Sequence, residues 1–266
     1  MPERPIGVFD SGVGGLTVLR ELRRQIPGES LVYLGDTARV PYGTKSSPTV
    51  LRYSHEAARF LLAQRVKLLV VACNTASAVA LDELSERYQV PVIGVIEPGA
   101  KRALEVTRNG RIGIIGTEGT VRSGAYERAL RAIRPDVEVF AAACPLFVPL
   151  AEEGWACHEI ARLAAREYLA VLLDQGIDTL VLGCTHYPLL KQTLHEVAGP
   201  AVQLVDSARE TAKAVACRLE EQQLLHQSPT TAPPRYFVTD IPDRFERVGG
   251  SFLGERLQSV TTVNLD

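Results

Sequence analysis

The chain has 266 residues, 46% of them hydrophobic, which is enough for one large domain or two of ordinary size with a substantial core. Its net charge is −2, from 29 basic and 31 acidic residues mixed along the chain, which argues against a nucleic-acid partner. The N-terminus lacks the apolar core of a signal peptide, and no apolar run reaches membrane-spanning length. We therefore expect a cytoplasmic enzyme or binding protein without a membrane partner.

Apolar runs and amphipathic segments alternate along most of the chain. The apolar runs predict strands at Ile6–Phe9, Leu31–Leu34, Leu68–Ala72, Val92–Val95, Arg111–Ile115, Val137–Ala141, Thr179–Leu182 and Val202–Val205. Amphipathic segments between them predict helices at Leu16–Ile26, Thr49–Gln64, Ala76–Tyr88, Gly124–Ile133, Glu159–Leu173 and Pro188–Val197. Continuous apolar strands separated by helices are typical of α/β proteins, whose parallel sheets are covered on both faces. In such sheets, ligands bind beyond the carboxyl ends of the strands.

The last part of the chain has a different composition. SPTTAPP (Ser228–Pro234) is typical of a linker. Beyond it, short strands are predicted at Tyr236–Thr239 and Val260–Val263, on either side of Asp243–Phe252. We expect this piece to pack onto one half of the molecule.

Two stretches of the sequence repeat. LVVACNTAS from Leu69 resembles LVLGCTHYP from Leu180, and IGVFDSG from Ile6 resembles IGIIGTEG from Ile112. A fainter match pairs IGVIEPGAKRA with VQLVDSARETA. The matched segments are separated by nearly the same number of residues along the chain, which favours two related α/β halves. Chance similarity between apolar strands is the alternative, but it does not explain the cysteine at the same point of both halves.

Five cysteines are present, at Cys73, Cys144, Cys157, Cys184 and Cys217. Their number is odd and none form a C-x-x-C pair, so neither a disulfide framework nor a structural zinc site is expected. For Cys144, Cys157 and Cys217 we expect the role of a small buried apolar residue.

Cys73 and Cys184 each follow a buried strand and precede a predicted helix. Free amides and the helix dipole at such a joint favour an anion, so we expect them to lower a thiol pKa from its usual value of about 8.5. For either cysteine taken alone, the alternative to a catalytic role is that of a buried structural residue. Two thiols at equivalent points, however, predict a cleft in which one base meets each face of a substrate.

Three further side chains are candidates for acid/base chemistry. Asp10 follows the first strand, His186 stands two residues after Cys184, and Glu152 is expected in a loop after PLFVPLA. A carboxylate and an imidazole are the groups that accept or return a thiol proton. The alternative for His186 and Glu152 is an ordinary place in the first turn of a helix, and Glu153 competes with Glu152.

The glycine-rich turn Gly12–Gly15 does not have the spacing of a dinucleotide-binding loop, and Asp10 would place negative charge where a pyrophosphate rests. Its amides, with Ser11 and Thr75, are instead expected to hold a small carboxylate, while Asp10 meets an ammonium group. No metal is expected, because the C-x-H spacing at Cys184 is weak evidence for a ligand set. A Cys-His hydrolase would leave Cys73 without a role.

At these residues the sequence resembles the cofactor-independent aspartate/glutamate racemases, and within them the glutamate racemases. The motifs that carry the resemblance are GVFDSGVGGLTV, YLGDTARVPYGTKS, VVACNTASA, GVIEPG, CPLFVPLAEEG and LVLGCTHYPLL, in this order over most of the chain. The resemblance implies interconversion of L- and D-glutamate without a cofactor, which supplies D-glutamate for bacterial peptidoglycan. It further implies two domains, residues 1–97 with 208–266 and residues 98–207, with the site between them, and frequent homodimers.

The resemblance also implies roles for the site residues. Cys73 and Cys184 exchange the α-proton on opposite faces of the substrate, supported by Asp10, Glu152 and His186. Contacts to the substrate are expected at Asp10, Ser11, Tyr42, Gly43, Asn74, Thr75, Thr117, Thr120, Thr185 and His186. An aspartate racemase or another two-cysteine racemase is the close alternative. A two-lobed module that closes on an amino acid without reacting is the alternative from another class.

Overall fold

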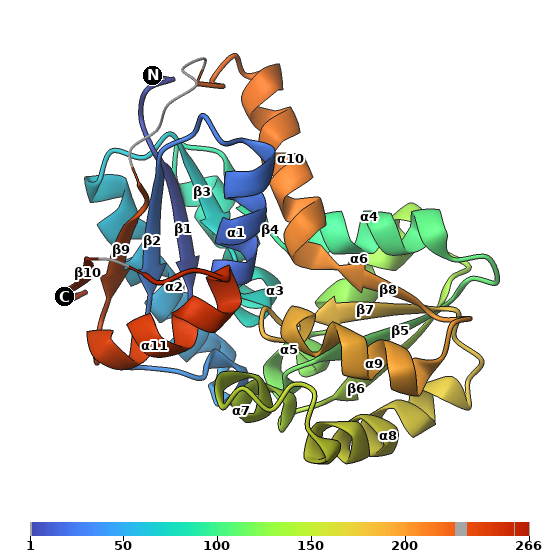
Figure 1. The fold of residues 1–266 in the computed structure, drawn as a ribbon. Helices are drawn as coiled ribbons and strands as arrows, with labels where there is room; N and C mark the ends of the chain where they lie inside the picture. Colours follow the sequence, from blue (N-terminus) through green and yellow to red (C-terminus); the bar gives the residue numbers. More distant parts are fainter. Residues whose placement is uncertain (1, 227–232, 258, 266) are drawn as a thin grey trace.

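A computed structural model gives the structure of the chain and describes residues 2–226, 233–257 and 259–265. Two parallel sheets form the molecule (Figure 1). One has six strands in the order β10-β9-β2-β1-β3-β4, and the other has four in the order β6-β5-β7-β8. The bounds are β1 Ile6–Asp10, β2 Leu31–Gly35, β3 Leu68–Val71, β4 Val92–Gly94, β5 Arg111–Gly116, β6 Glu138–Ala143, β7 Thr179–Gly183, β8 Gln203–Asp206, β9 Arg235–Val238 and β10 Val260–Thr262. The predicted α/β class is confirmed.

Helices cover both sheets (Figure 1). Their bounds are α1 Leu16–Gln25, α2 Ser47–Ala63, α3 Asn74–Arg87, α4 Ile96–Val106, α5 Glu118–Ser123, α6 Ala125–Ile133, α7 Phe147–Glu152, α8 Glu159–Leu173, α9 Lys191–Ala198, α10 Ser207–Glu221 and α11 Pro242–Leu253. Helices α4, α5, α7, α10 and α11 are not among the predicted ones. Pro98 in α4 and Pro149 in α7 lie in the first turn of their helices. N–H groups in the first turn have no acceptor within the helix, so a proline there removes no helical hydrogen bond. The predicted helix Pro188–Val197 is a 3₁₀ turn at Tyr187–Leu190 that leads into α9.

The four strands of the smaller sheet repeat the order of β2-β1-β3-β4 in the larger one. The register repeats as well, because Val8 lies opposite Val70 in one sheet and Ile114 opposite Val181 in the other. This agreement supports the two related halves. The fainter sequence match is out of register with the structure. It aligns Ile93 with Val202, whereas the strand pairing makes Ile93 of β4 the counterpart of Val205 in β8, and Gly94 that of Asp206.

The end of the chain returns to the six-stranded sheet. Strand β9 pairs with β2 and β10 pairs with β9, which confirms the two predicted short strands. Helix α11 lies between them in sequence and packs against α1. The predicted linker Ser228–Pro234 lies mostly outside the described residues. We call the six-stranded sheet with its helices, α11 included, the first half, and the four-stranded sheet with its helices the second half; α10 packs on both α1 and α4 (Figure 1).

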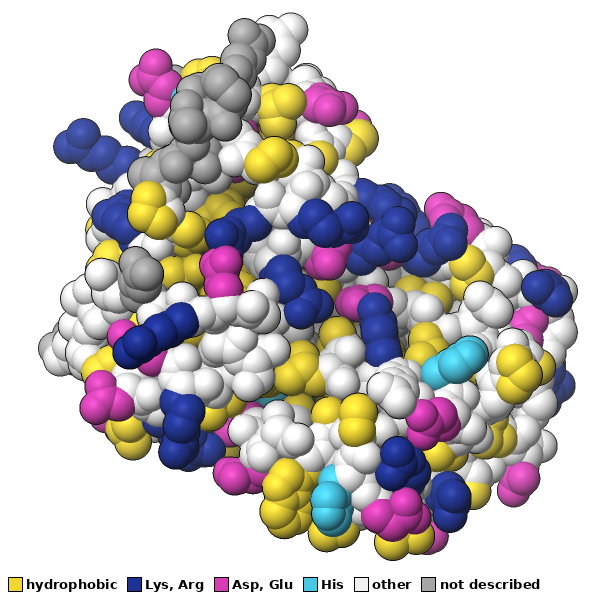
Figure 2. Space-filling view, viewed as in Figure 1, with side chains coloured by type: hydrophobic (Ala, Val, Ile, Leu, Met, Phe, Trp, Pro, Cys, Tyr) yellow, Lys and Arg dark blue, Asp and Glu magenta, His cyan; other side chains and the backbone are white. Residues whose placement is uncertain are grey.

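The core of each half is formed by strands that are buried on both faces. All five residues of β1 and all four of β3 are buried, as are all five of β7. On the surface, basic and acidic side chains are interspersed over both halves on the face seen in Figure 2. No helix in the described ranges is long and apolar enough to cross a membrane.

Candidate active site

A small cavity lies where the carboxyl ends of the two sheets meet. Its volume is about 30 Å³, and both Cys73 and Cys184 line it. The lining comprises Ser11, Val40, Pro41, Tyr42, Gly43, Cys73, Asn74, Thr75, Thr117, Val148, Cys184, Thr185 and His186. It includes every predicted site residue except Asp10, Glu152 and Thr120, each of which is hydrogen-bonded to a residue of the lining. The structure therefore brings together residues that the sequence places more than a hundred positions apart.

Cys73 is itself the N-cap of α3, so the helix begins at Asn74 and not after Thr75 as expected. Its sulfur accepts a hydrogen bond from the Ala76 amide at 3.5 Å, and its thiol lies 3.8 Å from the Ser11 hydroxyl. Burial raises the pKa of the Cys73 thiol to about 12, nearby Asp10 adds to the rise, and the Ala76 amide opposes it. The expected lowering of this pKa is wrong, because removal from water outweighs the helix N-terminus.

Cys184 follows the last residue of β7 and is buried. No α-helix begins at this joint; a 3₁₀ turn starts at Tyr187 instead, which contradicts the expected helix cap. The Cys184 sulfur has the His186 imidazole as a hydrogen-bond partner, with His186 Nδ1 3.8 Å away. The two cysteines thus occupy equivalent strand ends with different neighbours.

His186, which lines the cavity, forms an ion pair with Glu152. The His186 Nε2 lies 3.0 Å from Glu152 Oε1. Burial would lower the pKa of His186, but its bonds with Cys184 and Glu152 raise it to about 10. For Glu152, burial is outweighed by the hydrogen bond and charge of His186 and by Arg244, which together lower the pKa of the carboxyl. Glu152 lies at the end of α7, whereas a loop was expected.

Asp10 is almost fully buried at the end of β1. Burial raises the pKa of its carboxyl, against the opposing charge of His186 and several hydrogen bonds. The Gly12 amide donates to Asp10 Oδ2 at 3.0 Å, and the Thr185 hydroxyl to Oδ1 at 3.4 Å. That Gly12 amide is therefore already bonded, contrary to the expectation that it holds a substrate carboxylate.

The glycine-rich turn lets the two halves approach each other closely. A Cβ on Gly14 would lie 2.3 Å from Thr185 Oγ1 and 2.5 Å from His186 Nδ1, so both of those side chains would have to shift. Thr17, just after the turn, donates to the Thr185 carbonyl at 3.0 Å. A second such approach occurs at Gly43, where a Cβ would lie 2.5 Å from Thr117 Cβ. These glycines serve close packing across the cavity.

A second group of polar side chains from both halves meets around Thr75 and Thr117, which line the cavity. The Oγ1 atoms of Thr75 and Thr117 are 2.9 Å apart, and each lies 3.1 Å from Thr120 Oγ1. The Tyr126 hydroxyl donates to Asn74 Oδ1 at 2.7 Å. The Asn74 Nδ2 group is buried and has no hydrogen-bond partner among the described residues. This orphaned donor borders the cavity and is available to a ligand.

Some contributors to the site were not predicted. Val40, Pro41 and Val148 line the cavity, and Tyr126 and Arg244 bond to residues of the site. The first three lie inside the quoted motifs, but their apolar side chains carry no acid/base signal.

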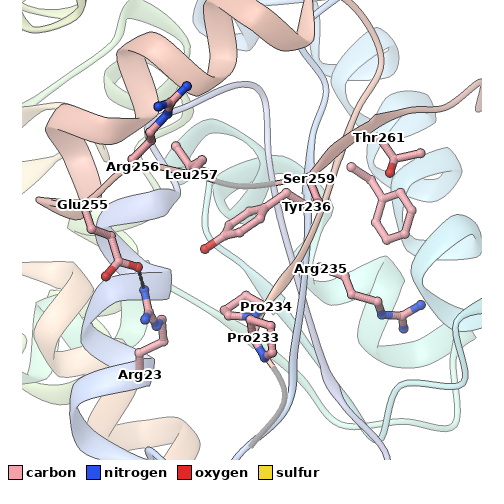
Figure 3. Close-up of a pocket in the computed structure, with 11 residues that line it drawn as sticks. Arg23, Pro233, Pro234, Arg235, Tyr236, Glu255, Arg256, Leu257, Ser259 and Thr261 are labelled. Carbon is pink, nitrogen blue, oxygen red and sulfur yellow. Dashed lines mark hydrogen bonds and ion pairs between the residues drawn. The ribbon is translucent and has the colours of Figure 1, made fainter.

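Other candidate positions separate clearly from this cavity. Cys144 is buried as expected, but Cys157 and Cys217 are exposed, which corrects their expected role. A larger cavity of about 700 Å³ lies beside β9, where Figure 3 shows Arg23 paired with Glu255 across from Tyr236. No cysteine or histidine is among the described residues that line it, so it lacks the thiol and imidazole groups found in the small cavity. Among the described residues, no three His, Cys, Asp or Glu side chains are arranged to hold a metal ion.

Comparison with known proteins places this chain, with its two sheets and two cysteines in one cavity, among the amino-acid racemases. A model of the Asp/Glu/Hydantoin racemase family matches residues 6–215, and the chain belongs to this family. It is 59% identical to the glutamate racemase of Geobacter metallireducens, over 100% of this chain and 98% of that protein. It is 52% identical to the glutamate racemase of Syntrophus aciditrophicus, over 98% of this chain and 97% of that protein.

Solved structures agree with this assignment. The glutamate racemase of Francisella tularensis, in complex with D-glutamate, superposes with a TM-score of 0.93 at 40% identity, over 100% of this chain and 99% of that one. The Thermus thermophilus enzyme, in complex with β-chloro-D-alanine, gives 0.89 at 49% identity, over 99% and 98% of the two chains. An aspartate racemase from Picrophilus torridus gives 0.56 at 16% identity over 84% of this chain, which shows a shared fold alone.

Proposed function

We propose that the protein is a glutamate racemase that interconverts L- and D-glutamate without a cofactor. The observation that carries the proposal is that Cys73 and Cys184 follow equivalent strands of the two halves and line one cavity. Glutamate is favoured over aspartate because the relatives at 52% and 59% identity are glutamate racemases, whereas the aspartate racemase structure is only 16% identical.

In the proposed reaction, one cysteine thiolate removes the α-hydrogen as a proton and the other thiol donates a proton to the opposite face. The two roles exchange in the reverse direction. His186, held by Glu152, stands beside the Cys184 sulfur; as an imidazolium it stabilises the Cys184 thiolate and is the group that exchanges a proton with it. Asp10 is the candidate for the same task at Cys73, with Ser11 bonded to the thiol.

The α-hydrogen of an amino acid is very weakly acidic, so the site must stabilise charge that develops on the substrate. The orphaned Asn74 Nδ2 donor, with the hydroxyls of Ser11, Thr75 and Thr185, is suited to the substrate carboxylates. Loss of one such donor typically costs about 2.7–4 kcal/mol of transition-state stabilisation, so several acting together are required.

Substrate entry requires the two halves to move apart. The cavity measures about 30 Å³, whereas a single water already needs about 10–15 Å³. Glutamate is far larger than this space, so the structure corresponds to a closed form. Closure around the substrate would exclude water and strengthen the electrostatic interactions inside.

The remaining parts of the proposal concern organisation and role. We propose residues 1–97 with 208–266 as one domain and residues 98–207 as the other, because the strands of the two sheets divide in this way. We further propose a homodimer and the supply of D-glutamate for peptidoglycan, as the family resemblance implies, and a cytoplasmic location.

The proposal is tested by incubating the protein with D-glutamate in deuterated water without added cofactor. Optical rotation should decay to zero while deuterium enters at the α-carbon, with L-glutamate behaving in the same way. A parallel arm with D-aspartate should show little turnover, and a chelator should leave the rate unchanged. Turnover of aspartate but not glutamate would assign the alternative substrate, and binding without exchange would support a non-catalytic amino-acid module.

A further inference from the structure

Helix α11 brings two side chains from the first half to the His186–Glu152 pair of the second half. Arg244, in its first turn, bonds to Glu152. Phe252, near its end, packs edge-on against the His186 ring with 5.3 Å between ring centroids. Arg20 of α1 donates to the Phe252 carbonyl at 2.8 Å and so holds α11 in place. The same helix therefore contacts both members of the pair.

Arg244 and His186 bind different oxygens of one carboxylate. Arg244 Nη2 lies 3.0 Å from Glu152 Oε2, while His186 Nε2 lies 3.0 Å from Oε1. The other nitrogen of His186, Nδ1, faces the Cys184 sulfur. A continuous path thus runs from Arg244 through Glu152 and His186 to the thiol. Because a carboxylate held at both oxygens cannot rotate freely, the direction of its bond to His186 is fixed by Arg244.

Arg244 acts from outside the substrate cavity. It lines a neighbouring cavity of about 90 Å³ together with Glu152, and it is absent from the lining of the cavity that holds the two cysteines. Half of its side chain is exposed, at 52%, whereas Glu152 is largely buried at 17%. The guanidinium therefore reaches inward from the surface to a carboxylate that water reaches poorly, and it helps to keep that carboxylate charged.

We propose that Arg244 is a positioning residue that aligns Glu152, and through it His186, with the Cys184 thiol. The inference deepens the proposed racemase function and rests on it. Since Arg244 and Glu152 belong to different halves, their bond forms only when the halves are together. It therefore completes the acid/base group of Cys184 in the closed form and is absent when the site opens.

The test compares Arg244→Gln and Arg244→Lys with Arg247→Gln as a matched control. Arg247 lies on the same helix, is exposed, and lines neither of these two cavities. For Arg244→Gln we expect kcat for glutamate to fall about fivefold, the size of effect of one partly exposed ion pair, with KM unchanged. Arg244→Lys should recover part of the loss, and Arg247→Gln should match the wild type.

A double substitution separates positioning from a general structural effect. In a Glu152→Gln background, Arg244→Gln should reduce kcat no further, because the path through the carboxylate is already lost. The proposal would be overturned if Arg244→Gln reduced kcat equally in the wild-type and Glu152→Gln backgrounds, or if it changed only KM. An inactive wild type would instead overturn the racemase function itself, whereas an active wild type with an unaffected Arg244→Gln variant would overturn only the role of Arg244.

Discussion

Cys73 and Cys184 hold equivalent positions in the two halves of the molecule and line the same cavity. Each follows the strand, β3 or β7, that pairs directly with the first strand of its half. Their surroundings differ, since Cys73 is bonded to Ser11 and Cys184 faces His186. The fold thus supplies two similar thiols, and the neighbouring residues give them different partners for proton exchange.

The close approach at Gly14 predicts a large effect of a single methyl group. In Gly14→Ala, the new Cβ would stand 2.3 Å from Thr185 Oγ1, so Thr185 and His186 must move. We expect kcat/KM for glutamate to fall about 100-fold, because small displacements of acid/base groups have effects of this size. Steady-state kinetics with circular dichroism to confirm folding provide the measurement.

The matched control is Gly250→Ala in α11, whose Cβ would meet only the Glu255 carbonyl at 3.5 Å. This variant should retain wild-type activity. If Gly14→Ala were as active as Gly250→Ala, the close contact of the two halves would not matter for catalysis.

The hydroxyl of Tyr126 is predicted to orient the Asn74 side chain. In Tyr126→Phe, the donor 2.7 Å from Asn74 Oδ1 is lost, and a buried acceptor is left without it. We expect the free energy of unfolding to fall by about 1–1.5 kcal/mol and KM for glutamate to rise about tenfold. Denaturant titration and kinetics measure the two effects.

Tyr168→Phe serves as the control, since the Tyr168 hydroxyl accepts a hydrogen bond from the Leu146 amide at 3.4 Å, away from the cavity lining. It should leave KM unchanged. A Tyr126→Phe variant with normal KM would show that Asn74 is held in place without this bond.

His186 is predicted to make stability depend on pH in the alkaline range. The pKa of its imidazole is raised from 6.5 to about 10, so the folded protein keeps a proton that the unfolded chain releases. The contribution of this proton to the free energy of unfolding is complete below pH 6.5 and is lost as pH rises toward 10. Between about pH 7 and about pH 9.5, the free energy of unfolding should therefore fall by about 1–3 kcal/mol more in the wild type than in His186→Gln.

The control for this comparison is His195→Gln, because His195 is exposed on α9. Its pH dependence should follow that of the wild type. Parallel curves for the wild type and His186→Gln would mean that His186 is neutral in the folded protein.

The sequence allowed the strands, the parallel sheets and the paired cysteine joints to be predicted, because apolar runs and repeated motifs are local signals. The bonds of Tyr126 to Asn74 and of Arg244 to Glu152 carry no local signal, since each joins residues from different elements and different halves. Helices with a proline in the first turn, such as α7, interrupt the expected pattern.

The predicted direction of the shift in the Cys73 pKa was wrong for a related reason. The helix N-terminus can be recognised in the sequence, but the loss of water around the sulfur depends on both halves together. The same holds for Cys157 and Cys217, whose exposure depends on the surface that each helix or loop presents.

The central claim is that each half contributes one of two opposed proton-transfer groups. Its most direct test is to follow optical rotation and α-deuterium for each enantiomer of glutamate in deuterated water with Cys73→Ala and Cys184→Ala. We predict that both variants lose racemisation by at least about 10³-fold, as expected when a covalent or proton-transfer group is removed. Any residual α-deuterium exchange should be confined to one enantiomer, and to opposite enantiomers in the two variants. Racemisation at the wild-type rate by either single variant would contradict the account.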